Sequence, residues 1–426
     1  MTLDQLLIDT LEHAAQAPWY RAQWGARWRS IRSVEQLSRL PLLDKPTASK
    51  HQAELIVGKR PAGVGVVSSG TTRGEQYIDP LNVPRTPEEL AATARAAALT
   101  GEPSGWTLSV VSVHHGLPRR LAGPHELMLP WLHDANALAM LETTLRHPQP
   151  DGRRVTAMVI GSGPIKVFTS ALAERGIDPR TFGVELIGTF SFRLSSTWTR
   201  LVEERFGARV FDNYSLSEFP TPFTTCSACG WLHAGQPPML VELLDLHADR
   251  PAKRGCAGRL VFTSLVPFVT SMPLIRYDTH DVAITGPLCR ATGQTGLKVL
   301  GRRKHGLEVD GAFICNAVDV RDVLEALPES HKTTHPMTKL GLVKSEELGP
   351  PRWTVALEEG QAVLRFEVRF DPDIYRARAR ELEQHVSEQL CALDPLTRRF
   401  AGKRRARLVV RAVRPGTLKA LTERYD

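Results

Sequence analysis

Residues 68–74, SSGTTRG, combine glycines, hydroxyl side chains and one arginine directly after a short apolar run. Glycine lets the backbone turn tightly and direct its N–H groups at an anion, while hydroxyl and guanidinium groups add further donors. Such a loop suits the β- and γ-phosphates of ATP, although the same composition also fits a surface turn. It lacks the closing Lys-Ser/Thr of the Walker pattern, which argues against a P-loop NTPase.

A second group of chemically active residues is the segment TTCSACGWLH, which places Cys226, Cys229 and His233 within eight residues. Cys-x-x-Cys-Gly forms a tight knuckle in which two thiolates bind one Zn²⁺, and a histidine can add a nitrogen. A closed tetrahedral site needs a fourth ligand. The alternative is a set of small buried thiols. A redox role is disfavoured because no thioredoxin-like helix follows.

Carboxylates occur in two further polar segments, each after a strand candidate. These are DNYSLSEF at 212–219, which contains Glu218, and PLIRYDTHDVA at 273–283, which contains Asp281. GRRKHG at 301–306 marks a change in the sequence pattern. Taken singly, Glu218 fits a solvated loop carboxylate and Asp281 fits a turn former. Their order along the chain gives them more meaning, because independent context is what confirms a motif.

The elements that must position these residues alternate between strand and helix. Apolar runs such as WTLSVVSV, RVTAMVIGS, ARVFDNYS and GRLVFTSL are separated by helical stretches at 166–175 and 198–206. This alternation predicts an α/β domain with a largely parallel sheet. After residue 301 two strands, a helix at 373–390 and a third strand predict a small α+β module. We therefore expect a domain at 1–301 and a smaller one at 302–426.

The ordered motifs resemble the core motifs of adenylate-forming enzymes. The SSGTT-x-G loop, the tyrosine segment ending in Ser-Glu, the RY-x-T-x-D segment and the Gly-Arg hinge occur in family order. The opening APWYRAQW…SVEQLSRLPLLDK is similar to that of phenylacetate–CoA ligases and the related acyl-protein synthetases. The resemblance implies a large N-terminal α/β adenylation domain with mixed sheets and a small, mobile α+β C-terminal domain.

The resemblance also implies how a nucleotide is held. Glu218 would hold Mg²⁺, whose preference for oxygen ligands suits a carboxylate and phosphate oxygens. Tyr214 would offer an aromatic face to the adenine, and Asp281 would accept hydrogen bonds from the ribose, with Arg302 nearby. The full set of implied nucleotide-binding residues is Ser68, Ser69, Gly70, Thr71, Thr72, Gly74, Asn213, Tyr214, Ser215, Asp281 and Arg302.

The catalytic lysine of the family lies near the C-terminus, after a Pro-Gly-x-Leu turn. The tail VRPGTLKALTERYD is similar and contains one lysine, Lys419, at a shorter spacing than is usual. The hinge position that relatives fill with Asp holds Lys304, and the Gly of their Thr-Gly-Asp is His280 here. These departures leave the second half-reaction, which depends on rotation about the hinge, less supported than adenylation.

The resemblance extends to the metal site and the acyl pocket. Relatives carry a cysteine-containing insert before the hinge, which favours Cys289 as the fourth zinc ligand, with Cys256 as the rival. Zinc would then be structural and would clamp the loop after Glu218. The segment LIGTFSF holds the place of the acyl pocket, which it would line with Gly188, Phe190 and Phe192.

Charge and composition indicate which classes of ligand the protein could bind. The net charge of +8 and pI near 9.3 suit polyanions such as ATP, pyrophosphate and coenzyme A. The basic run at 398–414 lacks interleaved aromatics, which favours a solvated strand over a nucleic-acid site. The sequence shows no secretory signal and no membrane-spanning stretch, so we expect a soluble cytoplasmic protein. Six cysteines are too few for a disulfide scaffold and suit a reducing compartment. The sequence does not decide between a monomer and a homodimer.

The leading hypothesis is ATP-dependent activation of a carboxylic acid, aryl or medium-sized, as acyl-AMP with release of pyrophosphate. The acyl group would then pass to coenzyme A, a carrier-protein thiol or another nucleophile. His280 and Lys304 motivate an alternative in which the enzyme adenylates an unusual oxyanion, or forms an amide or ester without a thioester. The atypical tail around Lys419 motivates another, a non-catalytic nucleotide-binding homologue.

Overall fold

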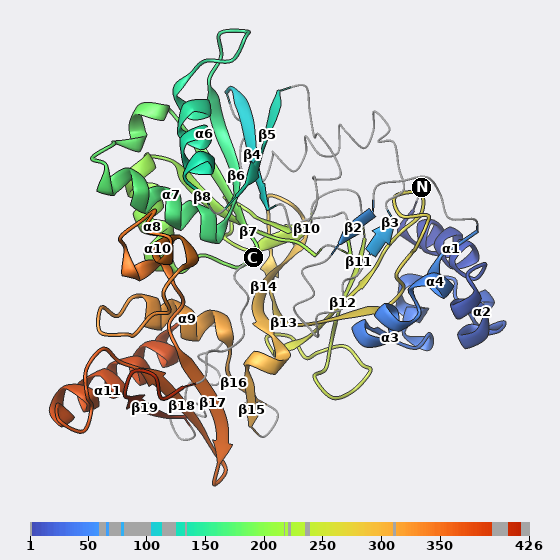
Figure 1. The fold of residues 1–426 in the computed structure, drawn as a ribbon. Helices are drawn as coiled ribbons and strands as arrows, with labels where there is room; N and C mark the ends of the chain where they lie inside the picture. Colours follow the sequence, from blue (N-terminus) through green and yellow to red (C-terminus); the bar gives the residue numbers. More distant parts are fainter. Residues whose placement is uncertain are drawn as a thin grey trace. The chain divides into compact units, whose positions relative to one another are not determined.

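The computed structural model describes residues 2–58, 65–67, 78–80, 104–112, 125–132, 134–216, 218–219, 223–234, 239–309, 312–393 and 408–418. The chain divides into two compact units (Figure 1). Unit 1 comprises residues 1–102, 111–128 and 213–299, and unit 2 comprises 103–110, 129–212 and 300–426. The change near residue 301 thus falls close to a boundary between units, but the C-terminal module shares unit 2 with 129–212. A separate mobile domain from 302 onward stays a prediction.

Antiparallel strands build most of unit 1. Their order is β11-β12-β13-β14-β10-β9, and the pairs β11–β12, β12–β13, β10–β14 and β9–β10 are antiparallel. The last two residues of β8, Asn213 and Tyr214, pair with β9. The bounds are β8 Arg209–Tyr214, β9 Phe223–Thr225, β10 Leu232–Ala234, β11 Leu240–Leu244, β12 Gly258–Thr263, β13 Tyr277–Leu288 and β14 Thr295–Arg302. A separate pair, β2 Gly65–Val67 and β3 Ile78–Pro80, is also antiparallel.

Short helices form the N-terminal part of unit 1. Apolar residues at helical spacing bury Leu7, Leu11 and Ala14, and the Thr2 hydroxyl caps the first helix. The helices are α1 Leu3–Ala14, α2 Pro18–Trp24, η1 Arg27–Ser30, η2 Val34–Arg39, α3 Lys45–Lys50 and α4 Gln52–Leu55, with the short strand β1 Leu43–Asp44 before α3. η2 is a 3₁₀ helix that begins directly after Ser33. Its N-cap Ser33 makes no capping hydrogen bond to the helix backbone, whereas Gln36 Oε1 does accept from Arg32 N at 2.8 Å.

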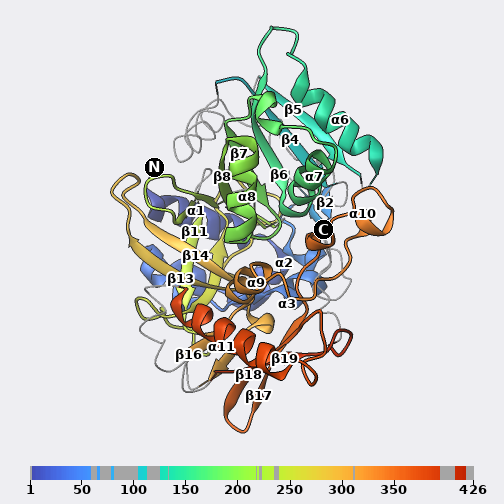
Figure 2. The same ribbon diagram turned by 90° about the vertical axis from the view of Figure 1, so that its left-hand side faces the viewer.

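Unit 2 contains the parallel strands that the alternation predicts. β6 pairs in parallel with β4 and β7, and β7 with β8; β5 lies beside β4. Helices α6, α7 and α8 belong to this part of the chain (Figure 2). The bounds are β4 Trp106–Ser112, β5 Glu126–Trp131, α6 Ala135–Arg146, β6 Val155–Gly161, α7 Ser162–Glu174, η4 Pro179–Phe182, β7 Leu186–Phe190 and α8 Ser196–Phe206.

The C-terminal module has its own hydrophobic core. Strands β17, β18 and β19 form a sheet in which β17–β18 is antiparallel and β18–β19 parallel, and α11 covers this sheet (Figure 1). Buried side chains such as Val320, Leu364 and Val386 join α9, the sheet and α11 in one cluster. The bounds are η5 Arg303–His305, β15 Leu307–Val309, β16 Ala312–Cys315, α9 Ala317–Glu325, α10 Pro336–Lys339, η6 Glu346–Leu348, β17 Trp353–Glu358, β18 Gln361–Glu367, α11 Arg376–Ala392 and β19 Leu408–Val413.

A buried ion pair ties the module to the rest of unit 2. Lys166 Nζ on α7 lies 3.0 Å from Glu325 Oε1 at the end of α9, and both side chains are almost fully buried. Ser195, the N-cap of α8, donates its hydroxyl to Glu325 Oε2 at 2.6 Å. Burial opposes the charge on Glu325, but the ammonium of Lys166 and other partners outweigh it, so the pKa of Glu325 lies below its usual value.

Taken together, the elements confirm an α/β architecture with a large mixed sheet and a small separate one. The prediction of a largely parallel sheet is wrong for unit 1, because short hairpin connections such as the one between β9 and β10 can join only antiparallel neighbours. Across the described residues, no helix combines the length and apolar character that crossing a membrane requires.

Candidate functional site

Two of the residues predicted to bind a nucleotide touch each other in unit 1. Tyr214, at the end of β8, donates its hydroxyl to Asp281 Oδ2 on β13 at 2.6 Å, and Asp281 is only 4% exposed. The tyrosine ring also packs near Phe223 and Phe262, with ring centroids 6.0 and 6.4 Å away. The neighbouring Asn213 accepts a hydrogen bond from Thr224 at 2.7 Å. β8, β12 and β13 therefore hold this part of the predicted site rigidly.

An irregularity in β13 directs Asp281. The register with β12 shifts between Arg259 and Val261, and within this shift His280 has φ +62°. Only glycine adopts that left-handed conformation without steric cost. His280 N donates to Asp278 Oδ1 at 2.9 Å, and Asp281 N donates to the Thr279 hydroxyl at 3.1 Å. The turn directly before Asp281 therefore contains a strained residue, His280.

Glu218, the predicted magnesium ligand, is buried beside a lysine and a tyrosine. Lys45 Nζ and Tyr277 Oη each lie 2.9 Å from Glu218 Oε1. Burial opposes the carboxylate charge, but Lys45 and the Tyr277 hydroxyl outweigh it, and the pKa of Glu218 lies below its usual value. The surroundings of Glu218 therefore stabilise an ionised carboxylate, which is paired with Lys45.

Lys45 is a partner of Glu218 that sequence reasoning missed. It lies in LLDKP, part of the resembling N-terminal segment, and it begins α3. β1 pairs in parallel with β13, matching Leu43 with Tyr277, and Asp44 caps α3 by accepting from Thr47 N at 2.7 Å. This pairing brings the first residue of α3 to the strand that carries Tyr277. A motif pattern could not show it, because the two segments are more than 200 residues apart.

Arg276, directly before β13, holds the start of this strand through buried ion pairs. Its side chain is fully buried and its Nη2 lies 3.0 Å from Glu242 Oε1 and 2.6 Å from Asp249 Oδ1. Nη1 donates to the carbonyl of Leu40 at 2.5 Å. One guanidinium therefore joins β11, the loop after it and the segment before β1, which suits the planar fork of arginine.

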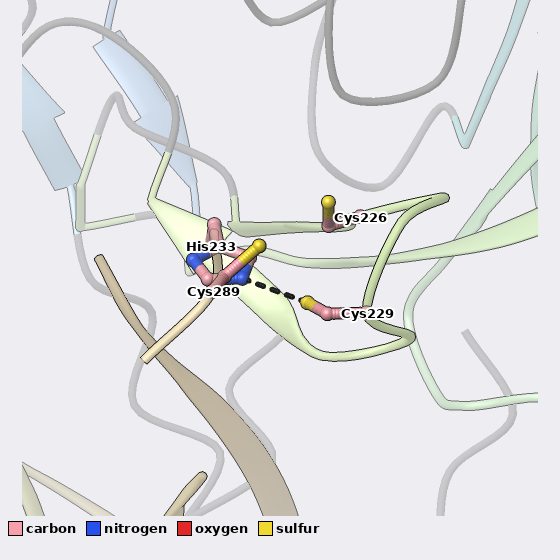
Figure 3. Close-up of side chains that lie close together, drawn as sticks. All are labelled: Cys226, Cys229, His233 and Cys289. Atoms are coloured by element: carbon pink, nitrogen blue, oxygen red, sulfur yellow. Dashed lines mark hydrogen bonds between the residues drawn. The ribbon is translucent and has the colours of Figure 1, made fainter. Parts of the chain in front are cut away.

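Three cysteines and one histidine converge in unit 1 (Figure 3). The ligand atoms of Cys226, Cys229, His233 and Cys289 all lie within 4.8 Å of one another. Cys229 Sγ is 3.1 Å from His233 Nε2. Cys256, the rival fourth ligand, is outside this group among the described residues. Such a Cys₃His set at this spacing fits the tetrahedral donor set that Zn²⁺ prefers.

The backbone around the cluster repeats one turn. Gly230 N donates to the Cys226 carbonyl at 2.8 Å, and Gly293 N donates to the Cys289 carbonyl at 2.8 Å. Gly230 and Gly293 have φ +72° and +67°, so each turn needs a glycine. Burial raises the pKa of Cys229 to about 11, whereas the Thr292 hydroxyl lowers that of Cys289 to about 7. Burial lowers the pKa of His233, which favours the neutral imidazole that binds metal.

In unit 2 the acyl-pocket candidates lie on and after β7. Gly188 is buried inside the strand, and Phe190 and Phe192 are half-buried. Ser162 donates its hydroxyl to the Phe190 carbonyl at 2.9 Å, and the guanidinium carbon of Arg321 lies 4.9 Å from the Phe192 ring centroid. The pocket itself stays a prediction.

The remaining predicted residues divide into two groups. Arg302 ends β14 half-buried, Lys304 is exposed in η5, and Ser215 is exposed after β8. Gly301, before Arg302, has φ +96°, which explains the glycine of the hinge motif. The phosphate loop and the proposed catalytic lysine lie outside the described residues: Ser68, Ser69, Gly70, Thr71, Thr72, Gly74 and Lys419.

Comparison with known proteins identifies the fold. No protein-family model matches the chain, and no curated protein matches its sequence. Solved structures do match. An open conformation of 2-hydroxyisobutyryl-CoA ligase in complex with 2-HIB-AMP and CoA is similar with a TM-score of 0.69 at 17% identity, covering 99% of this chain and 89% of that one.

A postadenylation state of 2-hydroxyisobutyryl-CoA ligase with R3-HIB-AMP matches with a TM-score of 0.67 at 18% identity, over 98% of this chain and 86% of that chain. ATP-bound MatB from Rhodopseudomonas palustris matches with a TM-score of 0.52 at 13% identity, over 84% and 68%. These likenesses show that the chain has the fold of adenylate-forming enzymes, as its motif order predicts.

Proposed function

We propose that this protein is an AMP-forming acid ligase, which joins a carboxylic acid to the AMP part of ATP and releases pyrophosphate. The observation that carries the proposal is the contact between Tyr214 and Asp281, in a fold shared with acyl-CoA ligases. A carboxylate oxygen attacks the α-phosphorus, the bond to the bridging oxygen breaks, and pyrophosphate leaves with the negative charge. Fixed donors and positioning supply most of the rate in such transfers.

Each residue would have a separate task. Asp281 would accept hydrogen bonds from the ribose hydroxyls, and Tyr214 would fix that carboxylate while its ring faces the base. The loop from Ser68 to Gly74 would bind the phosphates, and Lys419 would neutralise charge between the acid and the α-phosphate. These roles depend on a buried, pre-oriented carboxylate, because a flexible one would lose entropy when it orders on the ligand.

Magnesium fits the surroundings of Glu218. Mg²⁺, when bound, would neutralise charge on the phosphates of ATP. Glu218 would hold it, and the presence of Lys45 at 2.9 Å supports the idea that this carboxylate is charged and paired with a cation before the nucleotide arrives. Lys45 would then either contact a phosphate or stay on the carboxylate.

The Cys₃His cluster is proposed as a structural zinc site with Cys226, Cys229, His233 and Cys289 as ligands. Four protein ligands would fill the four positions of a tetrahedral Zn²⁺ and leave none for substrate. The zinc would hold the loop between β9 and β10 against the turn after β13. β9 begins a few residues after Glu218, so the zinc would also restrain the chain near that carboxylate.

The acyl acceptor is proposed to be coenzyme A, because the matching open conformation of 2-hydroxyisobutyryl-CoA ligase is a complex with 2-HIB-AMP and CoA. The test is acid-dependent pyrophosphate release from zinc-replete protein with a panel of aryl and alkyl acids, followed by mass spectrometry with and without CoA. A thioester supports the full proposal. An adenylate without a thioester would favour another acceptor, and no release with any acid would refute adenylation.

A further inference from the structure

The segment between β7 and α8 carries the two aromatic side chains proposed for the acyl pocket. Phe190 ends β7 and Phe192 follows two residues later, and both are half-buried. Ser191, which lies between them, has φ +79°, a left-handed conformation that is sterically unfavourable for residues with a side chain. Such a conformation persists only where the surroundings determine it. The placement of both rings therefore depends on contacts from neighbouring elements.

One side of this segment is held by the start of α7. Ser162, the first residue of α7, is fully buried and donates its hydroxyl to the Phe190 carbonyl at 2.9 Å. The same hydroxyl lies within hydrogen-bond distance of the Phe192 carbonyl. One buried hydroxyl therefore holds the backbone on both sides of Ser191, but it does not contact the ring of Phe192.

The other side of the segment is held by α9, a helix of the C-terminal module. The guanidinium carbon of Arg321 lies 4.9 Å from the centroid of the Phe192 ring, which is a cation–π distance. Asp322 Oδ1 accepts a hydrogen bond from Ser196 N, the first amide of α8, at 2.5 Å. Two neighbouring residues of α9 therefore contact the aromatic ring and the end of the same short segment.

Glu325, one turn further along α9, adds a third contact. Its Oε2 accepts from the hydroxyl of Ser195, the N-cap of α8, at 2.6 Å, and its Oε1 lies 3.0 Å from Lys166 Nζ on α7. Residues three and four apart share one face of a helix, so the side chains at 321, 322 and 325 project to the same side. The apolar residues of α9 belong instead to the core of the module, whose buried members lie between residues 314 and 410.

We infer that Arg321 and Asp322 are positioning residues for the acid, because they fix the segment 190–196 and with it the ring of Phe192. Acid binding thereby depends on a helix of the C-terminal module, although the pocket residues themselves belong to β7 and the segment after it. The inference rests on the proposed function, since it takes Phe190 and Phe192 as contacts of the acid. A ring that is placed before the acid arrives loses less conformational entropy when the acid binds.

The positioning is tested first without any substrate. In hydrogen–deuterium exchange of the full-length protein, we expect the amides of residues 191–196 to exchange about 10-fold faster in Asp322→Ala than in the wild type, because Ser196 N loses its acceptor. Asp322→Asn keeps an oxygen atom at the same place and should restore most of the protection. Unchanged exchange in Asp322→Ala would refute the positioning.

Glu174→Ala is the matched control for this experiment. Glu174, the last residue of α7, is an exposed carboxylate that accepts from Lys344 N at 2.8 Å and from Ser345 N at 3.0 Å, both in the C-terminal module. Its loss removes a contact of the same kind between α7 and the module, but none of the contacts to residues 190–196. Exchange there should stay as in the wild type. An equal acceleration in Glu174→Ala would show that any loosening of the module has this effect, and would overturn the inference.

If Asp322→Ala fails to fold, Arg321→Met replaces it in the exchange experiment. Methionine keeps much of the apolar stem of arginine and removes only the cation from the Phe192 ring. Faster exchange of the amides at 191–194 in that variant supports the positioning. Exchange identical to the wild type contradicts it.

The link to the acid is tested by acid-dependent pyrophosphate release. We expect Arg321→Met to raise the KM for the acid about 10-fold and to change the KM for ATP by less than about 2-fold, because Phe192 is assigned to the acid and not to the nucleotide. In a Phe192→Leu background the same substitution should change the KM for the acid by less than about 2-fold, because the ring through which Arg321 acts is absent.

Two kinetic results would overturn the inference: equal changes in both KM values, or an equal effect of Arg321→Met with and without the Phe192 ring. Either would show that Arg321 acts on the whole protein rather than on the wall of the acyl pocket. If the wild type releases no pyrophosphate with any acid, the proposed function fails, whereas the exchange experiment still decides whether α9 positions the segment.

Discussion

The buried pair between Lys166 and Glu325 gives the most demanding stability prediction. In Glu325→Gln the Lys166 ammonium, whose side chain is 3% exposed, would lose its counter-ion, and the short bond from Ser195 would lose its charged acceptor. Breaking a buried ion pair by removing one partner costs about 3–5 kcal/mol. For a unit of this size each kcal/mol lowers Tm by about 2–4 °C, so we expect a fall of roughly 6–20 °C.

The assay is urea and thermal unfolding of the full chain, with two comparison variants. Glu329→Gln removes a partly exposed carboxylate that pairs with the half-exposed Arg378, and should cost less than about 1 kcal/mol. The double variant Lys166→Met, Glu325→Leu replaces the pair with apolar side chains and should recover most of the loss. A loss below about 1 kcal/mol in Glu325→Gln, or a double variant at least as unstable as Glu325→Gln, would refute the reasoning.

The same pair predicts a pH dependence. The pKa of Glu325 is lower in the folded protein than in the unfolded chain, where it is about 4.3. The stability that its charge contributes is therefore present above that unfolded value and is lost as the pH falls through the folded value. The difference in unfolding free energy between wild type and Glu325→Gln should therefore shrink as the pH falls into the acid range.

Three further predictions follow from the site. His280→Gly should raise the unfolding free energy by about 0.5–1 kcal/mol, since glycine adopts φ +62° without strain; a loss of more than about 1 kcal/mol would show that the imidazole makes a stabilising contact. Lys45→Met should lower stability by about 3–5 kcal/mol near neutral pH by leaving Glu218 buried without its cation, and Mg²⁺ should restore part of it; an unchanged Tm contradicts this. Metal analysis should find about one zinc per chain, retained in Cys256→Ser, and a strong chelator should lower the Tm; protein purified without zinc that binds none would contradict the Cys₃His site.

Local pattern predicted much of the fold. The helix predicted at 198–206 is α8, Ser196–Phe206, and the run GRLVFTSL contains β12, Gly258–Thr263. These elements are long, periodic or rich in β-branched residues, so their own residues determine them. The pattern could not predict strand direction, because parallel or antiparallel pairing is decided by connections and partners far away in the sequence.

The site shows the same division. Motif order selected Tyr214 and Asp281, which lie in hydrogen-bond contact, and the cysteine spacing selected the members of the metal cluster. Sequence reasoning missed two ion pairs, that of Lys45 with Glu218 and that of Lys166 with Glu325. Each pair joins segments more than 150 residues apart, and neither belongs to a recognisable sequence spacing. Contacts of that kind depend on tertiary packing, which no local pattern encodes.

ATP–pyrophosphate exchange in the presence of the acid panel tests the central claim, that Asp281 and Tyr214 form part of a nucleotide site used for adenylation. The wild type should exchange with at least one acid. Asp281→Asn should raise the KM for ATP by roughly 10- to 100-fold, the value of a charged hydrogen bond. Asp151→Asn, which changes an exposed carboxylate, should leave it unaltered. Exchange that is absent with every acid, or equally strong in Asp281→Asn, would contradict the account.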